Sequence, residues 1–134
     1  MSNITLFDLQ KVMVRAYQDP NITASFFDML YDFLNNTSGV IKIKYDDGGK
    51  FIDIITSKVD PLIFTSKIKE LYARFVINVL NANELEYLLS KDTNYFIIKN
   101  MRESDIFNMA VGIVSVLDMS TGNDNSIFRV NLIN

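Results

Sequence analysis

The sequence contains no cysteine and no histidine. Without cysteine, the chain has no disulfide framework, no thiol nucleophile and no cysteine ligand for a metal. Without histidine, it lacks the commonest general base and the commonest metal ligand of proteins. Ser-His-Asp and Cys-His catalytic arrangements are therefore impossible within this chain. We expect no metal and no cofactor, and the composition favours a protein that is not an enzyme.

Targeting signals and long apolar runs are also missing. The N-terminal residues show neither the basic region nor the apolar region of a signal peptide. The longest strongly apolar run, at 104–118, is shorter than the roughly 20 residues that a bilayer-spanning helix needs. We expect a cytoplasmic protein with no membrane partner. The abundance of Asn, Ile, Lys and Asp is typical of an AT-rich genome and suggests a low-GC bacterium, a phage or a virus, in the last case acting in the host cytoplasm.

The balance of charge and apolar residues points to a protein partner. The net charge is −3, whereas general nucleic-acid binders usually carry a net positive charge. Apolar residues make up 49% of the chain, and the mean hydropathy is positive. We infer that another protein or a second copy covers part of this apolar surface. A length of 134 residues predicts a single domain spanning 1–134.

The clearest local signal is a hairpin over residues 40–56. Two β-prone runs flank Asp46-Asp47-Gly48-Gly49, and Asp47-Gly48 is a preferred type I′ turn pair. A two-residue turn there pairs Tyr45 with Lys50, Ile43 with Ile52, Ile41 with Ile54, and Lys42 with Asp53. This register places the isoleucines on one face and an opposite-charge pair on the other.

Helical periodicity predicts four further elements. A capping box of Thr5 and Asp8 begins the first helix, which ends before Pro20, and Thr23 or Ser25 caps the second. Asp60-Pro61 begins a third helix that reaches about Leu80, and a short fourth helix is expected over 84–90. Strands are expected over 95–99 and 126–133, the latter with Phe128 and Val130 in the core and Arg129 facing out.

The apolar run at 104–118 is predicted to be a helix buried on almost all sides, since its few polar residues form one narrow stripe. Its abundant Val and Ile also allow a strand over 110–116. Together these elements predict a small α+β fold with about four mostly antiparallel strands, in which helices pack around a buried helix at 105–118.

Carboxylates cluster only at Asp46, Asp47 and Asp53. Metal-dependent nucleases and phosphatases place such acids at strand ends to hold Mg²⁺. Turn formation explains the adjacent pair more simply, because aspartate is favoured in turns. A carboxylate-metal enzyme is therefore the least favoured hypothesis.

The first two helices carry aromatic residues that lie off their main apolar stripes: Phe7, Tyr17, Phe27 and Tyr31. Aromatic side chains of this kind are the usual anchors of protein interfaces. We therefore predict a non-enzymatic interaction, assembly or regulatory protein that binds another protein or its own copy as a homo-oligomer.

The alternative is a nucleic-acid-associated regulator. Residues 38–80 hold seven basic and five acidic residues. Within this segment a patch of Lys42, Lys44, Tyr45, Lys50 and Lys67 would contact nucleic acid or an acidic partner. A solvated face whose lysines discourage edge pairing explains the same residues.

Overall fold

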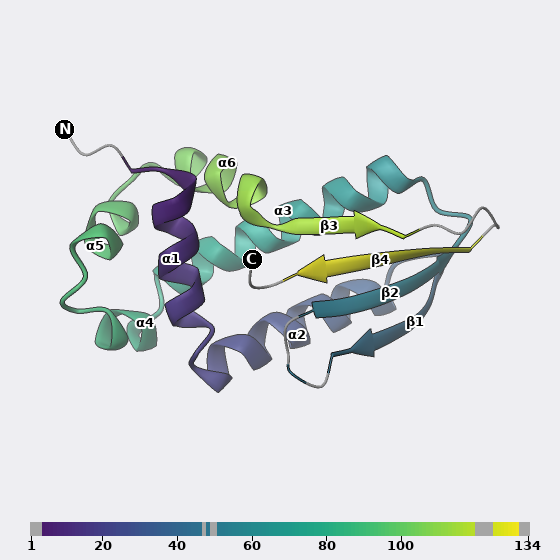
Figure 1. Cartoon of the computed structure of the whole chain (residues 1–134), viewed down its shortest axis with the longest axis horizontal. Coiled ribbons are helices and arrows are strands. Elements are labelled where there is room, and N and C mark those ends of the chain that lie inside the picture. The colour runs from purple at the N-terminus through teal and green to yellow at the C-terminus, as the bar shows by residue number, and fades with distance from the viewer. Residues whose placement is uncertain (1–3, 47, 49–50, 120–124, 132–134) are drawn as a thin grey trace. The chain divides into compact units, whose positions relative to one another are not determined.

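A computed structural model describes residues 4–46, 48, 51–119 and 125–131 (Figure 1). The elements follow the order α1 (Leu6–Ala16), α2 (Pro20–Asn35), β1 (Val40–Tyr45), β2 (Phe51–Ser57), α3 (Pro61–Leu80), α4 (Asn83–Leu88), α5 (Thr93–Lys99), α6 (Glu103–Ile113), β3 (Ser115–Asp118) and β4 (Asn125–Asn131). This confirms the predicted α+β class. Among the described residues, no helix is both long enough and apolar enough to cross a membrane.

Contacts divide the chain into two compact units. Unit 1 comprises Met1–Asp28 and Glu70–Ile113, and its described elements are helical. Unit 2 comprises Met29–Lys69 and Val114–Asn134, and it contains the sheet. Helices α2 and α3 each contribute residues to both units.

The helix starts follow local capping chemistry. The predicted capping box is present at α1, where the Thr5 hydroxyl accepts from the Asp8 N–H and the Asp8 carboxylate accepts from the Thr5 N–H. Helix α2 begins at Pro20, earlier than predicted, since the Asp19 carboxylate caps it by accepting from the Asn21 N–H. Asp60 does the same for α3 by accepting from two backbone N–H groups.

Unit 1 is built around an aromatic cluster. The ring of Phe26 lies 4.8 Å from that of Phe75 and 5.6 Å from that of Tyr72, both edge-on. Helix α1 adds a buried stripe of Leu9, Val12, Met13 and Ala16. Leu6, the first residue of the helix, is exposed.

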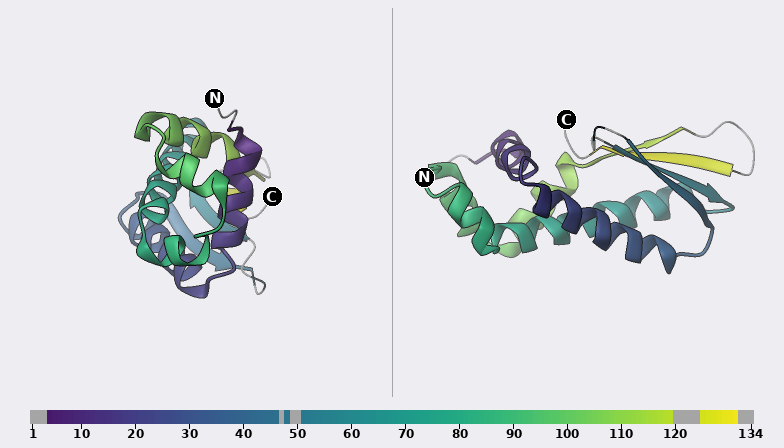
Figure 2. Two further views of the ribbon diagram at one scale, coloured as in Figure 1. Left: turned by 90° about the vertical axis from the view of Figure 1, so that its left-hand side faces the viewer. Right: turned by 90° about the horizontal axis from the view of Figure 1, so that it is seen from below.

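Unit 2 is a four-stranded antiparallel sheet in the order β1-β2-β4-β3. The unit 2 parts of α2 and α3 lie along one face of it (Figure 2). The Phe64 ring on α3 lies 4.7 Å from that of Phe128, and the face is otherwise formed by buried Ile52, Ile54 and Val130. Phe128 and Val130 therefore enter the core as predicted.

The hairpin is confirmed, but its predicted register is wrong by two residues. Ile43 pairs with Ile54, Lys44 with Asp53, and Tyr45 with Ile52. A shift of two keeps each side chain on its predicted face, because the side-chain period of a strand is two. An irregularity between Val40 and Lys42 leaves Ile41 exposed. Asp47 and Gly49 of the predicted turn lie outside the described residues, as does Lys50, the predicted partner of Tyr45.

Two predictions from apolar runs are wrong. Residues 95–99 form part of helix α5 and not a strand, since the Asp92 carboxylate caps the helix by accepting from the Asn94 and Tyr95 N–H groups. The helix predicted at 105–118 ends at Ile113, and Ser115–Asp118 form strand β3. Within α6 only Ile106 and Ala110 are buried, so this helix is not a central element covered on all sides.

Candidate interaction surfaces

The sheet face opposite the helices carries an ion pair stacked on an aromatic ring. Arg129 on β4 donates through Nε and Nη2 to the two carboxylate oxygens of Asp53 on β2, at 2.8 and 2.9 Å. The guanidinium carbon lies 3.9 Å from the centre of the Phe51 ring. These hydrogen bonds hold the pKa of Asp53 below its ordinary value of 3.8. The two charges largely compensate each other on this open face.

The same cross-strand row extends to both edges of the sheet. Lys44 on β1 lies opposite Asp53, and Leu117 on β3 lies opposite Arg129. Lys44 is exposed, and Leu117 is 52% exposed. The row therefore combines one additional positive charge with an apolar end. Such a surface suits a partner of mixed character more than a uniformly charged one.

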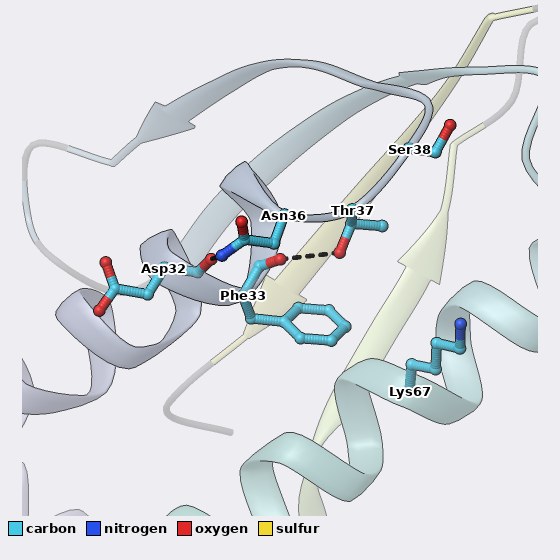
Figure 3. A pocket seen from close by; sticks show the side chains of 6 residues that line it. All are labelled: Asp32, Phe33, Asn36, Thr37, Ser38 and Lys67. Carbon is cyan, nitrogen blue, oxygen red and sulfur yellow. Dashed lines mark hydrogen bonds between the residues drawn. The ribbon is translucent and has the colours of Figure 1, made fainter.

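A second feature of unit 2 is a shallow hollow of about 560 Å³ where α2 ends (Figure 3). Its polar groups are largely used by the helix end, since Asn36 Nδ2 donates to the Asp32 carbonyl and Thr37 Oγ1 donates to the Phe33 carbonyl. Lys67 lies across the hollow from Phe33, and the Asp32 carboxylate points away from it. The hollow thus offers one ring and one ammonium group, which is too little to define a ligand.

In unit 1, two adjoining hollows form a groove between α3 and α6. The first, about 230 Å³, is lined by Ile77, Leu80, Asn81, Lys99, Met101, Glu103 and Ile106. The second, about 360 Å³, is lined by Ile77, Glu103, Ser104, Phe107 and Asn108. Ile77 and Glu103 belong to both, so an apolar side chain and a carboxylate lie where the hollows meet. We call this feature the α3–α6 groove.

Large apolar side chains are exposed in adjacent pairs on three helices. Leu62 and Ile63 in the first turn of α3 are 81% and 57% exposed. Tyr87 and Leu88 at the end of α4 are 85% and 44% exposed, and Leu6 and Phe7 begin α1 in the same way. Isolated exposed apolar residues are ordinary, whereas contiguous ones mark interaction sites.

The four aromatic residues predicted to meet a partner have different surroundings. Phe7 and Tyr31 are exposed, and the Lys11 ammonium lies 4.4 Å from the centre of the Phe7 ring. Phe27 is half-buried. Tyr17 is buried, which corrects the expectation that it stays uncovered, and its hydroxyl donates to that of Tyr72 at 2.7 Å. Burial raises the pKa of Tyr72 to about 12 and raises that of Tyr17 as well.

The predicted basic patch is divided between the two faces of the sheet. Lys42 and Lys44 lie on the open face, whereas Tyr45 pairs with buried Ile52 on the face that the helices cover. Lys67 belongs to α3, which packs on that covered face. Lys50 lies outside the described residues. The described members of the patch therefore do not form one continuous surface.

The carboxylates considered for a metal are not gathered either. Asp53 is engaged by Arg129, and Asp47 lies outside the described residues. In the part of the chain that the structure describes, no group of three or more acidic residues is placed to hold a metal ion. Every buried side-chain nitrogen and oxygen atom there has a hydrogen-bond partner.

Several residues of these surfaces were not singled out from the sequence. The buried stripe of α3 includes Phe64, Ile68 and Tyr72. Leu62 and Ile63 lie off this stripe, so their exposure could have been predicted from the sequence. Tyr87 and Leu88 gave a weaker signal, because α4 is too short for a periodicity. Sequence patterns could not predict the partner of Arg129 or the residues that line the groove, Ile77, Glu103 and Phe107. Packing between segments that are distant in the sequence brings these residues together.

Comparisons with protein-family models, with curated proteins and with solved structures find no match for this chain.

Proposed function

We propose that the protein is a non-enzymatic interaction module that binds another protein, or a second copy of itself, through exposed apolar side chains. The observation that carries the proposal is the set of adjacent exposed pairs, above all Leu62 with Ile63 and Tyr87 with Leu88. Transferring such a side chain from water into an interface contributes about 1.5–3 kcal/mol when burial is complete. Each pair therefore supplies free energy that offsets part of the cost of association.

The distribution of charged groups also supports binding over catalysis. The ion pairs of Arg15 with Asp92 and of Lys99 with Glu86 each include an exposed side chain at the protein surface. The buried tyrosines Tyr17 and Tyr72 bond to each other, and neither lines any of the three hollows described above. Catalytic sites instead collect titratable groups with shifted pKa values around a cavity.

A nucleic-acid-associated role has less support. Unit 2, which contains the predicted lysine patch, holds seven basic and seven acidic residues in its two sequence segments and is therefore neutral. The feature that favours this role is the neighbouring exposed pair Lys42 and Lys44 on the open face. Binding to nucleic acid that weakened steeply with added salt would favour it over a protein partner.

The proposal is tested in two ways. Sedimentation velocity over a wide concentration range measures self-association, and selection from a displayed random-peptide library measures the capacity to bind other chains. We expect the protein to self-associate, to bind peptides from the library, or both. We expect Leu62→Glu or Tyr87→Glu to weaken the interaction that is observed. Ser66→Glu, an equal charge change at an exposed position of α3, is the matched control. A monomer at every concentration that also enriches no peptide would refute the proposed function.

A further inference from the structure

The α3–α6 groove of unit 1 combines an apolar lining with an unusual charge arrangement. Ile77 and Phe107, one from each helix, are half-buried and line its larger hollow. Met101 and Ile106 also line the smaller hollow, whose exposed lining is mainly polar. The volumes of about 230 and 360 Å³ lie near or below the lower limit for small-molecule pockets, so the groove suits side chains of a partner chain.

Glu103 is the uncompensated charge of this groove. The other charged residue in its lining, Lys99, donates to Glu86 at 2.9 Å. Beside the groove, Arg102 is paired with Asp105 at 3.1 Å. Glu103 is exposed and makes no ion pair with any described residue. Arg74, one turn before Ile77 on α3, lines neither hollow.

Charge across the whole unit has the same sign. The segments of unit 1 contain nine acidic and six basic residues, so this unit alone accounts for the net charge of −3 of the chain. A negative potential attracts a cationic partner and raises the rate of encounter. The apolar lining then provides a surface that a cation alone would not use.

We propose that the α3–α6 groove binds a basic, amphipathic segment of another protein. Lysine or arginine of that segment pairs with Glu103, and a neighbouring large apolar side chain packs between Ile77 and Phe107. The inference rests on the proposed interaction function and adds the chemistry of the partner. Glu103 also stands in the first turn of α6, where an acid stabilises the helix dipole. That role does not depend on a partner, so a binding measurement separates the two.

The test uses three fluorescent peptides of equal length on the full chain. The first places Leu on one face of a helix and Lys on the opposite face, the second replaces each Lys by Glu, and the third replaces each Leu by Ser. Fluorescence anisotropy should show binding of the Leu-Lys peptide and much weaker binding of the other two. Loss with the Glu peptide reports the charge, and loss with the Ser peptide reports the apolar lining.

Two charge reversals locate the site. Glu103→Lys should weaken binding of the Leu-Lys peptide about tenfold or more, because like charges then meet at the groove. Glu84→Lys is the matched control, since it changes the net charge equally, lies in the first turn of α4 and lines neither hollow. Backbone resonances of Ile77, Glu103 and Phe107 should shift on addition of the peptide, and circular dichroism should show that both variants remain folded.

Several outcomes would overturn the inference. Equal weakening by both reversals would show general attraction to an acidic surface. Groove resonances that shift with protein concentration alone would identify a second copy as the occupant. Absence of Leu-Lys binding, together with enrichment of other peptides from the library, would remove this partner and leave the proposed function standing. Absence of all peptide binding and of self-association would remove both.

Discussion

Replacing Gly39 by alanine should destabilise the protein, because this position requires glycine for two separate reasons. Gly39 has a φ of +93°, which residues with a side chain rarely adopt. A Cβ built there would lie 2.6 Å from Val59 Cγ1 and 2.9 Å from the Ser57 carbonyl oxygen. That carbonyl belongs to the end of β2, and the Ser57 N–H donates to the Gly39 carbonyl at 2.8 Å. This bond ties the backbone at Gly39 to β2, so the backbone cannot easily move away from the added Cβ.

The expected loss follows from these two effects. A side chain at positive φ costs about 1–3 kcal/mol, and forcing atoms into a packed site costs about 1–3 kcal/mol more. Part of the strain is relieved by rotation of Val59, so we expect a total loss on the order of 3 kcal/mol. This corresponds to a urea midpoint lower by about 1–3 M, and to a melting temperature lower by about 10 °C.

Gly112→Ala is the matched control, and its expected effect has the opposite sign. Gly112 lies in helix α6, where alanine is favoured over glycine by about 1 kcal/mol. The added Cβ would meet only the methyl groups of Leu6, at 3.3 and 3.5 Å, and Leu6 is exposed enough to move. We expect a neutral or slightly stabilising change.

Urea unfolding followed by circular dichroism measures both variants. Fluorescence of the tyrosines provides a second probe, and agreement between the probes tests whether unfolding is two-state. The reasoning is refuted if Gly39→Ala has the same midpoint as the unmodified protein. It is also refuted if Gly112→Ala loses as much stability as Gly39→Ala, since the loss would then not arise from the local geometry of Gly39.

Four further predictions concern the cores and the open sheet face. Tyr17→Phe should cost about 1–3 kcal/mol, because the Tyr72 hydroxyl loses its donor while buried, and the double variant Tyr17→Phe/Tyr72→Phe should recover much of that loss in urea unfolding. The unmodified protein should lose stability as pH rises from 10 towards 12, because burial raises both tyrosine pKa values and the folded chain retains protons that the unfolded chain releases; the double variant should show a flatter pH profile. Arg129→Gln should destabilise the sheet at neutral pH. The difference from the unmodified protein should be full above pH 3.8, the ordinary pKa of Asp53, and should disappear as pH falls through its lower folded value; a difference independent of pH would contradict the ion-pair explanation. Val114→Asp should cost on the order of 4 kcal/mol or more, since it buries an unpaired charge, whereas Ser115→Asp at a half-buried strand position should be much milder. Equal melting temperatures of the last two variants would refute that assignment of burial.

The candidate groove illustrates why a site of this kind is difficult to read from sequence. Ile77 and Phe107 are thirty residues apart, and neither carries chemistry that attracts attention alone. Glu103 is one of several acids near the start of a helix, which is a common position for them. Its distinctive property is that Lys99 and Arg102 are paired with other acids. Such pairing depends on side-chain placement, which no local pattern contains.

The exposed apolar side chains were partly predictable. The excess of apolar residues in the composition suggested that some would remain uncovered, and Phe7 and Tyr31 are indeed exposed. Tyr17 was assigned to the same group because it lies off the main stripe of α1. Its burial beside Tyr72 and Phe75 shows that a helix can bury a second face when another helix packs against it.

The sequence by itself determined where most elements begin and what class of fold they form. The capping box of Thr5, the Asp-Pro pair at Asp60 and the glycine-containing segment after Tyr45 act over a few residues, so their effects follow from local geometry. The same is true of the alternation along β4, which placed Phe128 and Val130 in the core.

Only the tertiary structure decided the register of the hairpin, whether each apolar run forms a helix or a strand, and which residue pairs with Arg129. Residues 95–99 are apolar enough for either a helix or a strand, and the Asp92 cap with burial of Tyr95 and Ile98 selects the helix. The run at 104–118 divides between α6 and β3, because its last residues pair with β4. For the run at 104–118 and for the partner of Arg129, local preferences do not select one outcome, and contacts between residues far apart in the sequence supply the free energy that does.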